Sequence, residues 1–365
     1  GVYSNLKNTG TIASYGDNSK SRFQIGGIIA FSVKIGKLEN CVNGEQGTTK
    51  GAIIAEGKVG VAETYYPSIG GICGSFQGGS KGDLVIKNCT NYATITASQT
   101  TANAMAHAVG GIAAWIRSGA TIEGCHNYGH VNCSGLKNEA KLQIFIGGIT
   151  GILSDGKKIM TNNHNHGDIT VGENADGRLQ LGGVAGYCSH GVTNCSNEGK
   201  ITINGSPSIA SNTPGSVQGS GRTDADMNNR SNIGGVVGRI YNATVTASVT
   251  GLTNTGDILL PQADSIRCTA IGGVMGEAIL LKSTISTLSN SGDIKVENVN
   301  NKAMLNSIGG VIGRNFNMKI TSQTMSISDC TNSGNISLNE ITATNFVFIS
   351  FSASTIISKS VLSPT

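Results

Sequence analysis

The sequence predicts an all-β protein, a parallel β-helix or β-solenoid of about 8–9 coils of roughly 37–40 residues, with three short strands in each coil. Two recurring motifs and the composition support this prediction. A Gly-Gly pair flanked by aliphatic residues recurs eight times, an Asn-centred motif recurs nine times between the pairs, and Gly supplies 52 of the 365 residues. Self-similarity of this length is typical of architectures in which each repeat stacks on its neighbour.

The Gly-Gly pairs recur at intervals of 35 to 52 residues. Each pair follows Ile, Val or Leu and precedes Ile or Val. The pairs are Gly26-Gly27, Gly70-Gly71, Gly110-Gly111, Gly147-Gly148, Gly182-Gly183, Gly234-Gly235, Gly272-Gly273 and Gly309-Gly310. Glycine weakens a strand unless another chain segment approaches closely or the strand bends, so we expect one of these at every pair. A phosphate-binding loop would need a following helix, and no helical periodicity follows the pairs.

The second motif reads roughly x-C-x-N-x-G-x-I. Its Asn residues are Asn8, Asn43, Asn91, Asn127, Asn165, Asn197, Asn254, Asn290 and Asn332. Corners of a coil need left-handed or strained backbone, which Asn and Gly adopt at low cost. We therefore expect an Asn column at one corner, with amides hydrogen-bonded from coil to coil as in other cross-β ladders.

One repeat illustrates the three strands expected in each coil: Ile233–Gly238, Ala243–Val249 and Asp257–Leu260. Each strand would pair with its equivalent in the next coil, about 4.8 Å away, which gives a rod of about 40 Å. Parallel crossovers are overwhelmingly right-handed, so a right-handed coil is expected.

The repeats divide the chain into a solenoid, residues 1–338, and a C-terminal segment, residues 339–365. The longest insertion, residues 205–232, is rich in Ser, Asn, Gly and Asp. Its composition is typical of a surface loop, with a binding or processing loop as the alternative. In the C-terminal segment, residues 345–352 are expected to form an edge strand before a Ser-rich end. That strand would cap the solenoid or pair with another molecule.

Nine cysteines are present, and five share one repeat position: Cys41, Cys89, Cys125, Cys195 and Cys330. Leu or Asn replaces Cys in the other copies. Exchange with Leu favours free, buried thiols that behave as small hydrophobic side chains. Disulfides between neighbouring copies stay open, because stacked strands lie within bridging range.

One group of residues suggests a metal site. His126 and His164 occupy the same repeat position in consecutive copies, and His130 and Asp168 do so four residues further on. Two imidazoles and a carboxylate on one edge could bind a transition metal. The alternative is a solvated polar corner, since other copies hold Ser, Thr or Val at the His position. We assign no catalytic, cofactor-binding or metal-ligating residues, keep these four side chains as metal candidates only, and expect no cofactor.

Composition and charge exclude several classes of function. Only 13% of the residues are charged and 5% aromatic, without the basic stripe that nucleic-acid binding needs. No apolar run is long enough to span a membrane. A glycoside hydrolase needs two carboxylates at a fixed separation, whereas the 22 acidic residues here are scattered. We therefore expect a protein that is not an enzyme.

The x-G-G-[IV]-x-G unit, best seen at Ile271–Gly276 and Ile308–Gly313, resembles the GLUG-type repeats of bacterial surface proteins, including those of the Bacteroidetes. The resemblance implies an extracellular or cell-surface β-solenoid that acts as a stalk, filament subunit or binding segment. It implies as partners other copies, adjoining domains of a longer surface protein, and host glycoprotein or polysaccharide. A carbohydrate-active β-helix enzyme or polysaccharide-binding module is the alternative. The resemblance carries over no catalytic residues.

Overall fold

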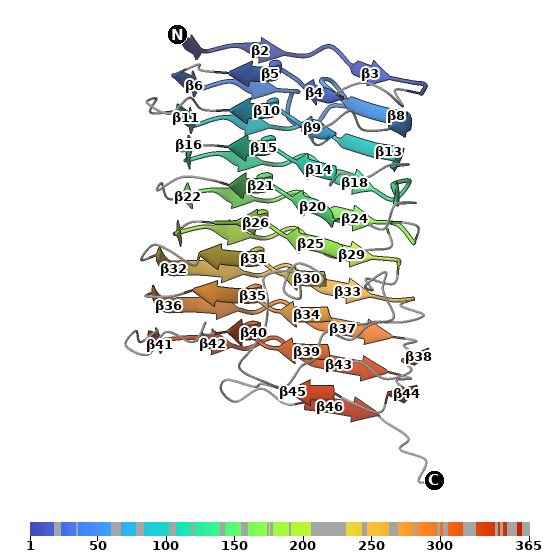
Figure 1. Cartoon of the computed structure of the whole chain (residues 1–365), viewed down its shortest axis with the longest axis vertical. Helices are drawn as coiled ribbons and strands as arrows, with labels where there is room; N and C mark the ends of the chain where they lie inside the picture. The colour runs from blue at the N-terminus through green and yellow to red at the C-terminus, as the bar shows by residue number, and fades with distance from the viewer. Residues whose placement is uncertain are drawn as a thin grey trace.

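The structure is a computed structural model. It describes residues 1–17, 23–33, 36–59, 67–77, 84–101, 107–117, 120–138, 143–154, 160–173, 175, 178–189, 191–205, 231–242, 247–262, 269–280, 283–297, 300–301, 306–316, 326–339, 342–343, 346–348 and 356–359. Within these ranges all regular structure is β-strand, and the strands pair in parallel. Figure 1 shows them stacked as successive coils along one axis, which confirms the predicted solenoid.

Four long sheets form the walls of the solenoid, and each coil visits them in the same order. We name them the pre-glycine, post-glycine, asparagine and return sheets.

The pre-glycine sheet runs into the first Gly of each pair. It contains β4 (Gln24–Gly26), β9 (Ser68–Gly70), β14 (His107–Gly110), β20 (Gln143–Gly147), β25 (Arg178–Gly182), β30 (Ser231–Gly234), β34 (Thr269–Gly272), β39 (Asn306–Gly309) and β45 (Phe346–Phe348). The post-glycine sheet follows the pair. It contains β5 (Ile29–Val33), β10 (Cys73–Gln77), β15 (Ala113–Arg117), β21 (Thr150–Ser154), β26 (Ala185–Cys188), β31 (Val237–Asn242), β35 (Met275–Leu280) and β40 (Ile312–Phe316).

The asparagine sheet has two rows of strands that merge in the long β32 and β36. Its first row is β1 (Val2–Ser4), β6 (Lys37–Glu39), β11 (Leu84–Lys87), β16 (Ala120–Glu123), β22 (Met160–Thr161), β27 (Val192–Thr193), β32 (Ala247–Asn254), β36 (Ser283–Asn290) and β41 (Ser326–Ser328). Its second row is β2 (Lys7–Asn8), β7 (Val42–Asn43), β12 (Thr90–Asn91), β17 (His126–Asn127), β23 (His164–Asn165), β28 (Ser196–Asn197) and β42 (Thr331–Asn332), continued by the ends of β32 and β36.

The return sheet closes each coil. It contains β3 (Ile12–Ser14), β8 (Ile53–Val59), β13 (Ile95–Thr101), β18 (Val131–Cys133), β19 (Lys137–Asn138), β24 (Ile169–Val171), β29 (Ile201–Ile203), β33 (Ile258–Leu260), β37 (Ile294–Glu297), β43 (Ile336–Asn339) and β46 (Ile356–Lys359). A small separate pair joins β38 (Asn300–Asn301) to β44 (Thr342–Ala343).

The three predicted runs per coil are confirmed, with one refinement. In the repeat taken as the example, the first run divides at its glycine pair into β30 and β31, and β32 and β33 form the second and third runs. β32 extends to Asn254, beyond the predicted end at Val249, and residues 243–246 of the predicted run lie outside the described residues. The eight described strands of the post-glycine sheet correspond to the eight Gly-Gly pairs, in agreement with the predicted number of coils.

The glycine pair divides the first run because the chain passes very close to the opposite wall there. A Cβ atom on the second glycine of any pair would lie 2.2 to 2.6 Å from Cγ of the motif Asn in the same coil, as at Gly148 with Asn165. It would also lie 1.9 to 2.3 Å from the next coil's glycine carbonyl oxygen at most of the pairs, Gly111 included. The close approach expected at the pairs is therefore confirmed, and no side chain fits at the second position.

The Asn column forms the predicted ladder, but it does not lie at a corner. From Asn8 to Asn332, each Nδ2 donates to Oδ1 of the next Asn at 2.7 to 2.9 Å. The same Nδ2 also donates to a nearby carbonyl oxygen, usually two residues ahead, as from Asn165 to Gly167 at 2.8 Å. Asn43 through Asn332 are buried inside the solenoid, so the corner placement is wrong. The amides belong in the interior because the ladder itself satisfies their hydrogen-bonding groups.

The left-handed corner lies three residues before each ladder Asn. All nine residues there have φ between 51° and 67°: Asn5, Asn40, Asn88, Gly124, Asn162, Asn194, Gly251, Thr287 and Asp329. Asn and Gly fill seven of the nine positions because they enter this region at low cost. Asn and Gly therefore do occupy the left-handed corner, as expected, but the corner Asn is not the ladder Asn.

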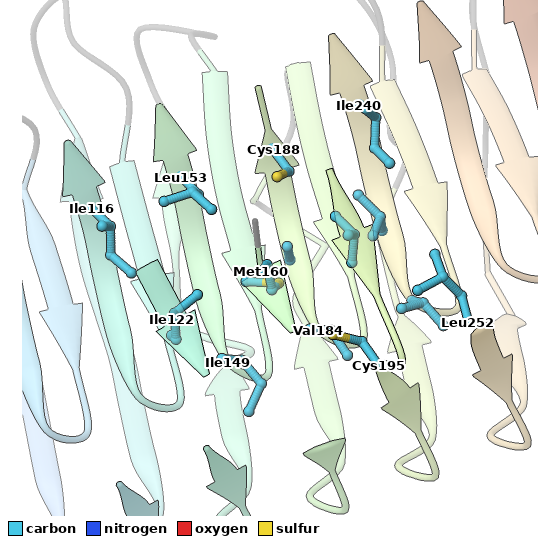
Figure 2. Packing of buried hydrophobic residues seen from close by; sticks show 14 of the residues in the cluster. Ile116, Ile122, Ile149, Leu153, Met160, Val184, Cys188, Cys195, Ile240 and Leu252 are labelled. Atoms are coloured by element: carbon cyan, nitrogen blue, oxygen red, sulfur yellow. The ribbon is translucent and has the colours of Figure 1, made fainter. Parts of the chain in front are cut away.

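The ladder and the glycine pairs divide the core in two. One cluster packs between the post-glycine and asparagine sheets, and Figure 2 shows its members, among them Ile116, Met160 and Leu252, spread over successive coils. The other packs between the pre-glycine and return sheets, with Ile columns such as that of Ile95. Each cluster is continuous along the axis because equivalent residues stack in register.

The C-terminal segment continues the stack. β45 pairs with β39 and β46 pairs with β43, so the segment covers two of the four sheets at that end (Figure 1). The capping role remains a prediction, and of the predicted strand 345–352 only residues 346–348 are described. Residues 206–230 of the insertion lie outside the described residues. The right-handed sense and the boundary at residue 338 remain predictions.

Replacing a ladder Asn in the middle of the stack should strongly destabilise the protein. Asn165→Ala leaves the Asn127 amide, the Asn197 carbonyl oxygen and the Gly167 carbonyl oxygen without their partner. With about 1–3 kcal/mol for each buried unsatisfied group, we expect a loss of about 3–5 kcal/mol in urea unfolding. Asn8→Ala, at the partly exposed end of the ladder, is the control and should cost under about 1 kcal/mol. Equal losses would contradict the role given to the buried ladder.

Thr287→Asn should stabilise the protein. Thr287 is exposed, is β-branched, and has φ 57° at a position where five other copies carry Asn. Relief of this strain should raise the free energy of unfolding by about 1 kcal/mol. Thr284→Asn, at an exposed position of the same strand, is the control and should be neutral or slightly destabilising. Thermal unfolding of the two variants and the parent protein checks this, and equal midpoints for all three would contradict it.

Candidate histidine site

The strongest cluster of polar side chains lies on the outer surface beside the Asn ladder. Because side chains alternate across a strand, the residues before and after each buried ladder Asn face outward. The residue before it is His126 in β17 and His164 in β23. The residue after it is Tyr92, Tyr128, His166 or Glu198 in four consecutive coils.

The structure places His126 and His164 together, as the repeat alignment predicts. They are register partners in the parallel pair β17 and β23, and their ring centroids are 5.0 Å apart. Both side chains are partly exposed.

His130 and Asp168 are not brought into the same group. Nε2 of His130 lies 2.9 Å from Oγ1 of Thr170, and Oδ1 of Asp168 accepts the backbone N–H of Lys200 at 2.8 Å. Asp257 and Asp293, in the same column as Asp168, accept backbone N–H groups of the next coil in the same way. This column therefore ties one coil to the next.

Two residues that the sequence analysis missed complete the cluster. Nδ1 of His166 lies 2.8 Å from Oε2 of Glu198, and Nε2 of His166 lies 3.4 Å from Nδ1 of His126. A hydrogen-bonded row thus runs from Glu198 through His166 to His126. Alignment of the residues after each ladder Asn would have shown Tyr92, Tyr128, His166 and Glu198 as one column.

The aromatic rings stack along the solenoid axis. Tyr92 and Tyr128 have centroids 5.1 Å apart at 15°, and Tyr128 and His166 have centroids 4.4 Å apart at 6°. Neighbouring rings therefore cover one another's faces, and the polar ring edges point outward. A platform for sugar rings would need open aromatic faces.

The surroundings of His126, His164 and His130 favour the neutral form of these three side chains. Burial lowers the pKa of His126, and neighbouring His164 and His166 lower it further; burial and then His166 lower the pKa of His164. Burial also lowers the pKa of His130. Neutral imidazole is the form that binds metal ions. Among the described residues, however, no three His, Cys, Asp or Glu side chains converge closely enough to hold one ion.

A second cluster, also missed, is buried on the outer side of the glycine bend. Arg239, Glu277 and Arg314 are register partners in β31, β35 and β40. Nε of Arg239 lies 3.1 Å from Oε2 of Glu277, and Nη1 of Arg314 lies 3.5 Å from Oε1. Asn232 of the pre-glycine sheet donates to Glu277 at 3.3 Å. Because these three charged side chains are buried against one another, we assign them a structural role.

The eight described cysteines are free thiols, and all except the partly buried Cys330 are buried, as the exchange with Leu predicts. In the stack of Cys41, Cys89 and Cys125, hydrogen bonding to the next thiol raises the pKa of Cys41 and of Cys89, and burial raises it further. Burial raises the pKa of Cys133 to about 12. The thiols of Cys41, Cys89 and Cys133 are therefore protonated at neutral pH and pack as hydrophobic side chains.

Comparisons with family models, with curated proteins and with solved structures find no match to this chain. The β-solenoid therefore stands on the geometry above, and the resemblance to GLUG-type repeats remains a prediction. Within the described residues, no helix is long and apolar enough to cross a membrane.

His107, outside the cluster, should make stability depend on pH. It is buried in β14, neither ring nitrogen has a hydrogen-bond partner among the described residues, and burial lowers its pKa to about 4. Because the pKa is lower in the folded state, the stabilisation is complete above about pH 6.5 and is lost as the pH falls toward 4. We expect this group to remove up to about 3 kcal/mol of stability over that interval.

His107→Leu should remove that component, because Ile144 and Leu179 fill the same buried column. Urea unfolding at pH 7.5 and pH 4.5 measures the effect in the variant and the parent protein. His130→Thr, at a partly exposed histidine, is the control. Parallel pH profiles for His107→Leu and the parent protein would contradict the assignment.

Proposed function

We propose that this chain is a non-enzymatic structural or adhesive β-solenoid of a cell-surface or secreted protein, acting as a stalk or binding segment. The observation that carries the proposal is the unbroken Asn ladder. Its eight rungs join all nine ladder residues through hydrogen bonds of 2.7 to 2.9 Å. A rod with a continuous interior network holds the residues on its surface at fixed spacing.

The use of the charged side chains also supports this proposal over a carbohydrate-active enzyme. A glycosidase needs two carboxyl groups that face a substrate. Here Asp168, Asp257 and Asp293 hold backbone N–H groups of the next coil, and Glu277 is buried between two arginines. These carboxylates have structural partners.

The exposed large apolar side chains mark the first coils as the surface where an adjoining segment or another copy would pack. The first coils carry six of the seven exposed large hydrophobic side chains among the described residues: Val2, Tyr3, Leu6, Tyr15, Phe31 and Val33. At the other end, β45 and β46 occupy two of the four sheets onto which another copy would stack.

The test combines mass, binding and product analysis on the whole chain. We expect mass photometry to give the single-chain mass of 37.4 kDa. We expect binding to host glycoprotein or polysaccharide on an array, with no cleavage products by chromatography. If the protein forms filaments and Leu6→Lys abolishes them, the chain is a filament subunit and not a stalk. If cleavage products appear, the chain is a carbohydrate-active enzyme. Absence of both binding and products would leave the stalk and remove the adhesive role.

A further inference from the structure

The outward cluster beside the Asn ladder has a hydrogen-bond pattern that selects one tautomer for each histidine. The Glu198 carboxylate can only accept, so Nδ1 of His166, 2.8 Å away, carries the proton. In the neutral form of His166 its Nε2 is an acceptor, and Nδ1 of His126, 3.4 Å away, is then the donor. His126 therefore keeps an unprotonated Nε2.

The neighbouring His164 has the matching arrangement. Its Nδ1 lies 2.8 Å from Oγ of Ser196, which can accept the Nδ1 proton and leave Nε2 unprotonated. Histidines that bind metals usually donate the other ring N–H to a carboxylate, carbonyl or similar acceptor, which fixes the tautomer and the ring direction. Both stacked imidazoles have such an acceptor.

We propose that His126 and His164 form a surface zinc site in which Nε2 of each ring is a ligand, with Ser196, His166 and Glu198 as the supporting hydrogen-bond partners. Two nitrogens on one tetrahedral zinc, each bound at about 2.0–2.1 Å, lie about 3.3 Å apart. The ring centroids are 5.0 Å apart and the planes are inclined at 28°, so binding one ion requires the two rings to tilt toward it. Both side chains are partly exposed, so water completes the coordination.

The stacking favours a cation over a glycan as the ligand of this cluster. The rings of Tyr128 and His166 cover each other at 4.4 Å, so the cluster offers ring edges with nitrogen and hydroxyl groups. The Glu198 carboxylate, 2.8 Å from Nδ1 of His166, adds to the preference for a cation. With two protein ligands, the site binds zinc more weakly than catalytic sites with three.

The experiment is a titration of the untagged whole chain with zinc chloride at pH 7.5, measured by calorimetry and by competition with a chromogenic chelator. We expect one zinc per chain. The variants take residues found in the same column of other coils, Thr90 and Ser196, and are therefore expected to fold. His126→Thr and His164→Ser should each weaken binding at least tenfold, and Glu198→Gln by about tenfold through the supporting shell.

His130→Thr is the matched control, because His130 is a partly exposed histidine of the next column, bonded to Thr170. It should bind zinc as the parent protein does. Thermal unfolding without zinc verifies that each variant folds, and zinc should raise the midpoint of the parent protein and of His130→Thr alone. No zinc binding by the parent protein, or unchanged binding by the His126→Thr/His164→Ser double variant, would overturn the proposal.

Discussion

The contact between the Asn ladder and the glycine pairs is the constraint on which the rest of the structure depends. A ladder amide is fully buried, so its hydrogen bonds must be made within the protein. The next coil supplies one hydrogen-bond partner, its own ladder Asn, only if the two coils are in register. The glycine pair on the opposite wall lies against the amide, and only a residue without a side chain fits there. A slip of one residue would turn every strand over and expose the aliphatic columns. The ladder, the glycines and the aliphatic residues therefore enforce the same register.

This mutual dependence explains how much of the fold the sequence reveals. Gly-Gly pairs, Asn residues and aliphatic neighbours recur because each is required in every coil, and their spacing predicts the solenoid and the pairing of equivalent strands. Spacing does not show which way a side chain points. The ladder Asn was therefore placed at a corner, whereas the left-handed corner three residues earlier accepts Asn, Gly, Thr287 and Asp329 and shows no single residue type.

The candidate site was predicted in part for the same reason. His126 and His164 share a repeat position, so alignment of the copies is equivalent to a contact prediction. His166 and Glu198 were missed because their column also holds Tyr92 and Tyr128, which do not look like one chemical group until they are stacked. Arg239, Glu277 and Arg314 each follow a glycine pair by four residues, so their adjacency could have been read from the sequence. Their burial follows from the bend at the glycine pairs, which only the structure reveals.

In-register stacking also restricts which chemistry a solenoid surface can carry. Equivalent side chains recur about every 4.8 Å, so like charges in one column repel. The column of Asp168, Asp257 and Asp293 reduces this repulsion by engaging each carboxylate with a backbone N–H group and by placing Lys200 in between. Stacked histidines avoid the repulsion by remaining neutral, since burial and neighbouring imidazoles lower the pKa of His126 and His164. In-register stacking therefore favours columns of uncharged side chains over rows of like charges.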